Sequence, residues 1–333
     1  DQIKLAGSHI IGTDVESLKE IFKNKSRCIL VTGPIINERA TGLDKTLLKD
    51  LFQLCKGKIP LLIEVDGPRQ QELKTSAPHE PDIPNFVDTV LVVADLDAIG
   101  KPLPENHIYM SDIYSQITQI PRGGTVTLES VTQFLLHESG GQKGIPPGAK
   151  RCLLLNSSNS RPCIPSQSLF NKLLTKFDVV IRATYNQHAA PEDSLLTIES
   201  VNEPVTAIIL AAGEAKRFGT QKQLLPWLGK PLIRHIVEIT LSSNVSEVIL
   251  VTGSGCDEVE DALTDTKIKI QRNPDWKYGI STSIRAGLRA SSSRAGAAIF
   301  ILADQPALSV SLINHLIEIR NLNRPMIVIP QVN

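Results

Sequence analysis

Short apolar runs and amphipathic stretches alternate through the second half of the chain. Strands are expected at 205–210, 245–253, 267–271, 297–304 and 325–330, and helices at 231–243, 257–265, 279–292 and 309–321. Runs such as AIIL and AIFIL are apolar at consecutive positions, which is typical of strands buried on both faces. The alternation of strand and helix predicts right-handed crossovers and a doubly wound, mostly parallel sheet of the Rossmann-like kind.

The first half has the same α/β character. Strands are expected at 28–34, 60–68, 89–100, 151–156 and 178–185, with helices at 14–22 and 47–55. Between the halves, a polar stretch rich in Pro, Asn, Asp and Ser has no sustained helical face, which is typical of a linker. We therefore predict two domains, residues 1–186 and 204–333, joined by a linker at 187–203.

Composition narrows the class of protein. The 333 residues are 41% hydrophobic and 21% charged, with a formal net charge of zero, so neither nucleic acid nor a membrane surface is an expected partner. No apolar run approaches the ~18 residues needed to span a bilayer. Five scattered cysteines without a C-x-x-C motif favour reduced thiols and a cytoplasmic location. The chain starts at Asp1 and ends in the strand-like MIVIPQVN, and we expect both domains to be cut at these ends.

The loop after the first strand of the second domain carries the strongest chemical signal. It is LAAGEAKRFG, residues 210–219, and its small residues let the backbone curl so that successive amides can point at an anion. Lys216, Arg217 and Lys222 can neutralise the charge of a triphosphate. We predict a phosphate cradle, although an ordinary loop with solvated lysines has the same composition. The candidate nucleotide-binding residues are Leu210, Ala211, Ala212, Gly213, Lys216 and Gly219.

Further loops are expected at the same end of the sheet, where doubly wound folds bind their ligands. Asp304 follows the run AAIFIL, and its carboxylate suits Mg²⁺ or, alternatively, caps the next helix. Gly279 precedes Ser281 and Ser283 at an expected helix start, where free amides and hydroxyls suit a base or ribose, or serve only as caps. The small residues at 251–258 can border the same ligand.

Four motifs in this order resemble a known family. LAAGEAKRFG, KQLLPWLGKPLI, NPDWKYGISTSIRAGL and ADQPAL are similar to the MobA-like nucleotidyltransferases, and most of all to the molybdenum cofactor cytidylyltransferases, over about residues 204–333. The resemblance implies Mg²⁺-dependent transfer of a nucleotidyl group from an NTP to the terminal phosphate of molybdopterin. It places Arg217, Lys222 and Asp304 in the catalytic site, with Asp304 as the metal ligand. The A-A-G form of the first loop implies CTP, whereas Gln223 departs from the family pattern.

The implied chemistry needs no general base. A phosphate monoester is already an anion at neutral pH and can attack an α-phosphorus directly, so the protein has to align the reactants and neutralise charge. Other interpretations stay open. They are another phosphorylated acceptor, such as a sugar or alcohol phosphate, GTP as the nucleotide, or a non-catalytic maturation factor that binds the cofactor and hands it on.

The first half carries the motifs EVDGPR, APHEPDIP, LDAIGKPL and GGQKGIPPGAKRCLLLN. They resemble the YqeC family, accessory proteins of selenium-dependent molybdenum hydroxylases, over about residues 25–185. The resemblance implies a P-loop-NTPase-like fold and a molybdenum hydroxylase apoenzyme as a partner, yet the chain has no G-x-x-x-x-G-K-[ST] motif. A rigid surface turn explains His79 and Glu80 as well as a site does. The candidate residues of this half are Glu64, Asp66, His79, Glu80, Asp97 and Lys101.

Overall fold

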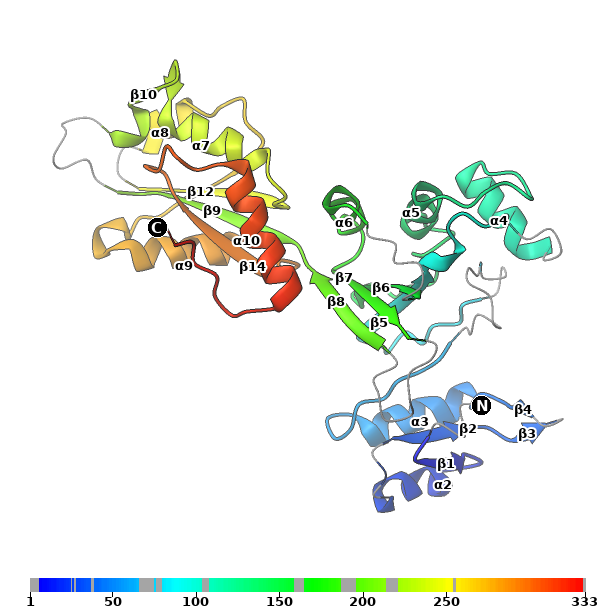
Figure 1. Ribbon diagram of the computed structural model, residues 1–333. Coiled ribbons are helices and arrows are strands. Elements are labelled where there is room, and N and C mark those ends of the chain that lie inside the picture. The colour runs from blue at the N-terminus through cyan, green and yellow to red at the C-terminus, as the bar shows by residue number, and fades with distance from the viewer. Residues whose placement is uncertain are drawn as a thin grey trace. The chain divides into compact units, whose positions relative to one another are not determined.

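The structure is a computed structural model of the chain. It describes residues 6–331 except 25, 27, 37–38, 66–74, 76–79, 104–107, 159–164, 187–195, 214–220 and 254–255, and the side chains of residues 39 and 108–111 are also not described. The chain divides into two compact units, residues 1–65 and 66–333, whose elements are labelled in Figure 1. Among the described residues, no helix is long and apolar enough to cross a membrane.

The unit of residues 1–65 is a small α/β structure. Its elements are β1 (Ser8–Ile11), α2 (Val15–Lys19), η1 (Glu20–Lys23), β2 (Ile29–Thr32), β3 (Ile35–Ile36), β4 (Arg39–Ala40) and α3 (Lys45–Cys55). β1 and β2 pair in parallel, whereas β3 and β4 form an antiparallel hairpin. Leu18 and Ile21 meet Leu51 and Cys55 in a core on which β1 and β2 also pack.

The larger unit begins with a mixed four-stranded sheet. Its strands, in spatial order, are β5 (Thr89–Asp95), β6 (Lys150–Ser158), β7 (Val179–Tyr185) and β8 (Leu196–Asn202). β5, β6 and β7 are parallel, and β8 runs antiparallel to β7. The helical elements are η2 (Leu96–Ala98), α4 (Ile108–Thr118), α5 (Leu128–Leu136) and α6 (Gln167–Leu173). Tyr114, Phe134 and Phe170 of these helices share one buried core with Leu153 and Leu155 of β6.

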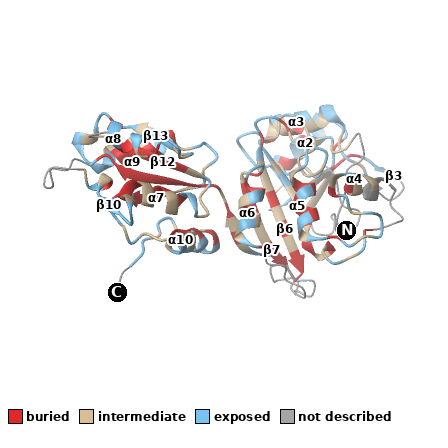
Figure 2. Cartoon of the chain, turned by 90° about the horizontal axis from the view of Figure 1, so that it is seen from above, coloured by how far each residue is buried: buried red, intermediate tan, exposed pale blue. Residues whose placement is uncertain are grey.

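A second, parallel sheet follows. In spatial order its strands are β13 (Lys269–Arg272), β12 (Glu247–Thr252), β9 (Val205–Ala211) and β14 (Ala297–Leu302), and every pair is parallel. β9 is buried along its whole length, as the burial colours of Figure 2 show. Ala207 and Ile209 belong to one core cluster and Ile208 and Leu210 to another. Because β9 has a core on each face, its sequence is apolar at consecutive positions.

Helices cover both faces of the parallel sheet. α9 (Ile280–Ala290) packs on one face, where a Cβ on Gly287 would lie 2.4 Å from Cγ2 of Ile208. The helices on the opposite face are α7 (Leu232–Leu241), α8 (Cys256–Asp261) and α10 (Val310–Asn323). The remaining elements are η3 (Lys222–Leu224), η4 (Trp276–Tyr278) and the hairpin β10 (Pro226–Trp227) with β11 (Lys230–Pro231). The prediction of an α/β protein with a doubly wound parallel sheet is confirmed.

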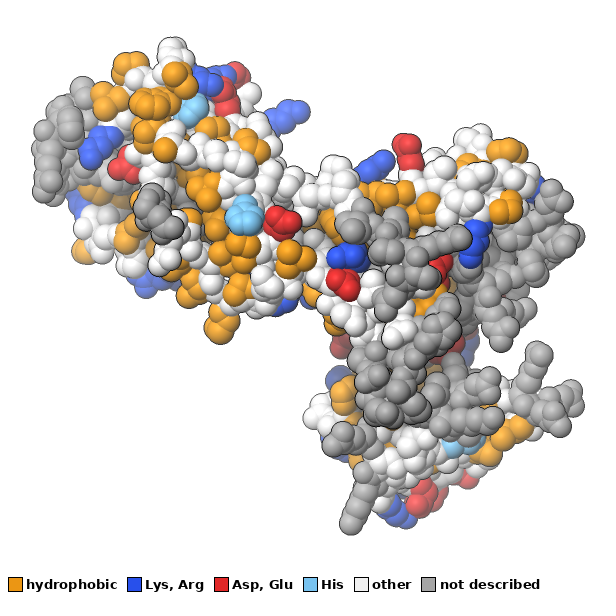
Figure 3. Space-filling model, viewed as in Figure 1, with side chains coloured by type: hydrophobic (Ala, Val, Ile, Leu, Met, Phe, Trp, Pro, Cys, Tyr) orange, Lys and Arg blue, Asp and Glu red, His pale blue; other side chains and the backbone are white. Residues whose placement is uncertain are grey.

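Three expected elements differ clearly from the structure, and the strand expected at 89–100 ends at Asp95, after which 96–98 form η2. Residues 325–330 form no strand, and Met326 and Ile327 are 101% and 76% exposed; Figure 3 shows other hydrophobic side chains on the surface as well. Prolines at both ends of this run cannot donate to a strand neighbour. Residues 60–65 of the strand expected at 60–68 are irregular, and 66–68 lie outside the described residues. Within the expected linker, 196–202 form β8.

Candidate functional site

The four expected loops start at one rim of the parallel sheet. Thr252, the last residue of β12, is in register with Ala211 at the end of β9. Leu302 of β14 is in register with Leu210, and the amide of Ala303 donates to the carbonyl of Leu210 over 3.3 Å. Because the strands are parallel, the loops that follow them leave on the same side, where ligands of such sheets bind (Figure 1).

Close packing joins three of these loops. Gly253, the first residue after β12, has no space for a side chain, since a Cβ would lie 2.8 Å from the carbonyl oxygen of Ala212 and 2.8 Å from Cβ of Trp276. The missing side chain lets the loops after β9 and β13 approach the loop after β12. Ala211 and Ala212 are only 1% and 6% exposed, so these two residues are packed inside the protein. Gly213 is exposed beside them.

Lys222 starts the η3 turn, which a buried glutamine fixes to the same rim. The side-chain amide of Gln223 donates to the carbonyl of Ala211 over 3.1 Å, and the residue is 7% exposed. This hydrogen bond holds the turn that carries Lys222 at the end of β9. From the sequence, Gln223 stood out only as a departure from the family pattern. Its hydrogen bond joins segments on the two sides of the loop, so no local sequence pattern could indicate it.

Asp304 lies two residues beyond Leu302 and so leaves β14 at the same rim. It is exposed, and among the described residues it makes no hydrogen bond or ion pair. The alternative role of helix cap belongs to Ser309, whose hydroxyl accepts from the amide of Leu312 over 3.2 Å at the start of α10. Asp304 is therefore available to bind a ligand.

A metal ion at this rim would have few protein ligands. The described residues contain no group of three or more His, Cys, Asp or Glu side chains that could hold a metal ion. Mg²⁺ suits such a site, because it commonly takes one or two carboxylates and completes its octahedral shell with substrate phosphates and water. Asp304 is the described carboxylate that fits this role.

The loop after β13 is organised by a buried asparagine. Asn273 is 4% exposed. Its backbone amide donates to the carbonyl of Thr252 over 2.8 Å. Its side-chain amide donates to the hydroxyls of Thr282 (2.9 Å) and Ser283 (3.0 Å). Ser283 is also 4% exposed, so its hydroxyl is engaged inside the protein, which favours the structural alternative for this residue.

The start of α9 presents the other predicted contacts of this loop. Gly279 has a φ of +102°, a conformation that favours glycine, and it precedes the helix without a side-chain cap. Both Gly279 and Ser281 are exposed, whereas the amide of Thr282 in the same turn donates to the carbonyl of Gly279. The structure therefore leaves Gly279 and Ser281 able to meet a ligand, and their role in nucleotide binding stays a prediction.

Several predicted residues lie outside the described part of the chain. These are Lys216, Arg217 and Gly219 of the cradle and Asp66 and His79 of the first half. The structure thus describes the two ends of the cradle, at 210–213 and at Lys222, and the roles assigned between them stay predictions.

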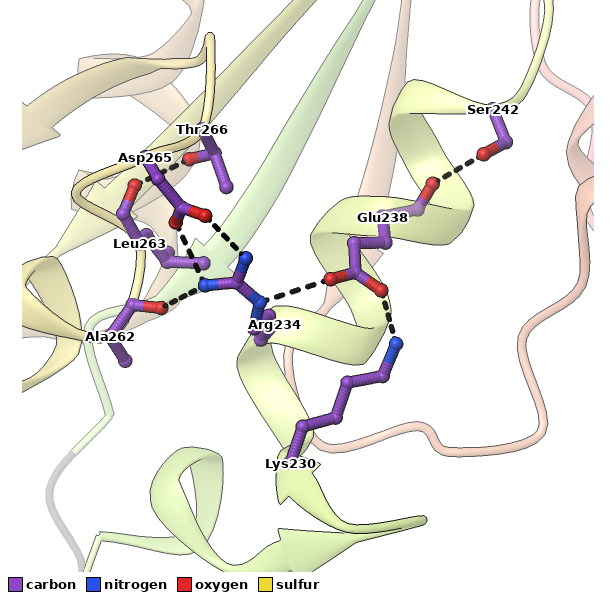
Figure 4. A network of polar contacts seen from close by, with 8 residues as sticks. All are labelled: Lys230, Arg234, Glu238, Ser242, Ala262, Leu263, Asp265 and Thr266. Atoms are coloured by element: carbon purple, nitrogen blue, oxygen red, sulfur yellow. Dashed lines mark hydrogen bonds and ion pairs between the residues drawn. The ribbon is translucent and has the colours of Figure 1, made fainter.

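An ion-pair network fixes the segment that follows the cradle (Figure 4). Arg234 of α7 donates to both carboxylate oxygens of Asp265, at 2.8 and 2.6 Å, and to Glu238 at 3.0 Å, while Lys230 of β11 also pairs with Glu238. The hydrogen bond from Lys230 is the main reason that the pKa of Glu238 lies below its ordinary value. The Asp265 partner likewise raises the pKa of Arg234. Lys230 thus has its partner within the fold, and the role of Lys222 at the rim stays a prediction.

The mixed sheet has a polar rim of its own. Asp97 follows β5, and its carboxylate accepts from the amide of Ser158 (3.1 Å) and the hydroxyl of Tyr185 (3.2 Å), at the ends of β6 and β7. Burial alone would raise the pKa of Asp97, but these hydrogen bonds and the charge of Lys101 lower it below its ordinary value. The structure thus brings Asp97 and Lys101 together. Glu64 is an exposed residue of the other unit and Glu80 is half-buried, and the site predicted for these residues stays a prediction.

Comparison with known proteins gives two family matches. Residues 207–333 match the family model of the MobA-like NTP transferase domain, and residues 6–112 match that of the YqeC protein. Both resemblances are confirmed. The YqeC match starts and ends earlier than the expected range of 25–185. The expected enzyme class, a nucleotidyltransferase, is confirmed at the level of the MobA-like domain.

Individual relatives resemble parts of the chain. Nicotine blue oxidoreductase of Paenarthrobacter nicotinovorans is 34% identical over 34% of this chain and 55% of its own length. Molybdenum cofactor cytidylyltransferase of Escherichia coli is 29% identical over 35% of this chain and 60% of its own length. The uncharacterized protein YqeC of Escherichia coli is 27% identical over 36% of this chain and 46% of its own length. A solved nucleotidyl transferase from Methanothermobacter thermautotroptrophicus is 31% identical, covers 34% of this chain and 57% of its own, and has a TM-score of 0.33.

Proposed function

We propose that the MobA-like domain transfers a cytidylyl group from CTP, with Mg²⁺, to the terminal phosphate of molybdopterin. The observation that supports this proposal is the common rim, since β9, β12 and β14 are parallel and Ala211, Thr252 and Leu302 end them at the same side of one sheet. The relative named molybdenum cofactor cytidylyltransferase supports the choice of nucleotide and acceptor.

In the proposed reaction, an oxygen of the acceptor phosphate forms a bond to the α-phosphorus of CTP while the bond to pyrophosphate breaks. No proton has to be removed from the attacking group, since it is already an anion. Lys222 and the backbone around Ala212 and Gly213 bind and orient the triphosphate. The positive charge of Lys222 stabilises the negative charge that develops on the leaving pyrophosphate. Mg²⁺, held by Asp304, would supply further charge neutralisation at the phosphate oxygens.

We further propose that the YqeC-like part acts in the same maturation of a molybdenum hydroxylase, because both family matches lie in one chain. The apoenzyme of that hydroxylase is the proposed protein partner. The cytoplasm is the proposed compartment, and the described cysteines, Cys28, Cys55, Cys152 and Cys256, are free thiols.

The test is a competition assay. CTP, GTP and ATP are supplied with Mg²⁺ and molybdopterin, and pyrophosphate release is followed together with the nucleotide found on the cofactor. We expect release with CTP and a cytidylylated cofactor. A preference for GTP would overturn the choice of base, and nucleotide binding without pyrophosphate release would favour the non-catalytic maturation factor. Pyrophosphate release only when a sugar or alcohol phosphate replaces molybdopterin in the assay would reassign the acceptor.

A redox reaction is a second candidate, favoured by the relative named an oxidoreductase. A nicotinamide dinucleotide contains a diphosphate, which the same amide and cation cradle can bind. The discriminating measurement is the absorbance of NADH or NADPH in the presence of the protein and an electron acceptor. Steady consumption of the dinucleotide, with no pyrophosphate released from CTP, would favour this candidate over nucleotidyl transfer.

A further inference from the structure

A hollow of about 480 Å³ lies between the end of β13 and α9, beside the rim of the parallel sheet. Three of its lining residues are arginines, Arg272, Arg285 and Arg289, and Asp275 is the one acidic residue among them. β13 is an edge strand of the sheet, and the hollow is lined by its last two residues on one side and by α9 on the other. Its size is within the range of sites for small ligands, ~300–1,000 Å³.

The three arginines differ in their partners. Arg272 donates to Asp257 (2.7 Å) and to both carboxylate oxygens of Glu260 (2.9 and 2.8 Å), and these hydrogen bonds, first those to Glu260, raise its pKa. Arg285 and Arg289 are exposed and, within the described part of the chain, form no hydrogen bond or ion pair. These two guanidinium groups therefore give the hollow two positive charges, which outnumber the one negative charge of Asp275.

Arg285 and Arg289 are one helical turn apart, and α9 contains no acidic residue. Like charges at this spacing destabilise a helix by a few tenths of a kcal/mol, about as much as an opposite pair stabilises it. Arg289 lies in the last turn of α9, where a cation suits the helix dipole, but this does not remove its repulsion with Arg285. An anion between the two guanidinium groups would remove that repulsion. Guanidinium forks match the oxygens of phosphate, which they bind in bidentate fashion.

The neutral groups of the hollow are already committed to the protein. Asn273 uses its side chain for Thr282, Ser283 and the amide of Asp275, and the hydroxyl of Thr282 donates to the carbonyls of Gly279 and Asp275. These bonds tie the neutral groups of Asn273 and Thr282 to the protein. The charged lining groups without a partner among the described residues are the guanidinium groups of Arg285 and Arg289 and the carboxylate of Asp275, two positive charges against one negative, so the hollow favours an anion.

The hollow also lies close to the proposed nucleotide site. Asn273 is bonded to Thr252 at the end of β12, and Gly253 after it packs against Ala212 of the cradle. Neighbouring strands are about 4.8 Å apart, so β13 is roughly 10 Å from β9, with β12 between them. A small molecule bound at Arg285 and Arg289 is therefore within reach of the cradle.

We propose that Arg285 and Arg289 bind the phosphate group of a small molecule in this hollow. The shared chemistry is a phosphate anion, and two sources fit it: a phosphate monoester, as in an acceptor, or pyrophosphate, as in a leaving product. The choice between these sources rests on the proposed function, whereas the anion site itself rests on the hollow and its charges.

The test compares the full chain with the double variant Arg285→Gln/Arg289→Gln in titrations with inorganic pyrophosphate and with glycerol 3-phosphate, followed by calorimetry. We expect the variant to bind at least one probe tenfold or more weakly than the native chain. A matched control is Lys172→Gln/Lys176→Gln, which removes the same charge at the same spacing from two exposed residues near α6 and should leave binding unchanged. The result is read from the difference in affinity between the native chain and the double variant, because the proposed cradle would also bind polyphosphates in both proteins.

A selective loss of pyrophosphate binding would assign the hollow to the product, and a loss of glycerol 3-phosphate binding would assign it to the acceptor. Equal affinities in the native chain and the double variant, or no binding of either probe to the native chain, would overturn the proposal. Titration with CTP and Mg²⁺ separates this outcome from the proposed function. Arg285 and Arg289 lie outside the cradle, so the double variant should bind CTP normally even where it has lost the phosphate probe.

Discussion

Gln223 is a buried polar residue whose one described bond fixes the turn that carries Lys222 to the end of β9. We expect Gln223→Ala to destabilise the chain by about 1–3 kcal/mol, because it leaves the buried carbonyl of Ala211 without its donor. CTP affinity should fall as well, since Lys222 loses its anchor. Urea unfolding and calorimetric titration measure the two effects.

A matched control for this substitution is Gln133→Ala. Gln133 also donates to a backbone carbonyl, that of Ile117, at 2.6 Å, but it is exposed, so water can replace the lost bond. We expect little change in stability and none in CTP binding. Unchanged CTP affinity in Gln223→Ala would remove the anchor from the account of the site.

Asp304 is expected to act on the metal and not on the fold. Asp304→Asn should abolish the dependence of CTP binding on Mg²⁺, because an amide is a poor ligand for this hard cation, while the midpoint of urea unfolding stays unchanged because Ser309 caps α10. Asp275→Asn is a control on the loop after β13, at the opposite edge of the sheet from β14, where the residue is also exposed. A variant at position 304 that keeps its full response to Mg²⁺ would exclude Asp304 as the ligand.

The short link between β8 and β9 is held to α10 by an ion pair. The carboxylate of Glu203 accepts from Arg320 (2.5 Å) and from Arg324 (2.7 Å), and its side chain is 13% exposed. Burial would raise the pKa of Glu203, but the hydrogen bonds from Arg324 and Arg320 outweigh it, so the pKa lies below the ordinary value.

A lowered pKa gives this link a defined pH dependence. The pair contributes its full stability above the unfolded pKa of Glu203, about 4.3, and loses it as the pH falls through the lower folded pKa. We expect Glu203→Gln to reduce stability by about 2 kcal/mol at pH 7 and to flatten the loss of stability below about pH 5. Urea unfolding across this range, with the exposed Glu318→Gln on α10 as control, measures both. An unchanged acid profile in Glu203→Gln would contradict the role of this pair.

The elements of the parallel sheet could be predicted because their signal is local. β9, β12 and β14 are apolar at consecutive residues, and this pattern follows directly from cores on both faces. The run MIVIP at 326–330 has the same composition but pairs with no strand in the described part of the chain, and it has prolines at its ends, so composition alone misleads there. β8 could not be predicted from its composition, since LTIESVN mixes polar with apolar residues. It forms a strand because it pairs with β7.

The same distinction applies to the site. The rim position of Ala211 and Asp304 could be predicted, because it depends only on strand direction. Three structural roles could not be predicted from the sequence, because each depends on a partner that folding brings close. They are the hydrogen bonds of Gln223 and Asn273 and the capping by Ser309. Likewise, Ser283 looked available for a ribose, and its burial against Asn273 appears only in the structure.

Considered as a whole, the chain joins a YqeC-like part to a MobA-like domain. The proposed function depends on two turns far apart in sequence, one with Lys222 and one with Asp304, holding the same magnesium–triphosphate at one rim. Groups that share a ligand are coupled, and their substitutions depart from additivity, typically by about 0.5–3 kcal/mol, whereas independent sites add.

The most direct test of this shared site is a double-mutant cycle of Lys222→Ala and Asp304→Asn. The affinity of each protein for CTP in the presence of Mg²⁺ is measured by calorimetry. We predict that each single substitution weakens CTP binding. The loss of binding free energy caused by the second substitution should be clearly smaller once the first has been made. Strictly additive losses, or CTP affinity that neither substitution changes, would contradict a single site formed by both turns.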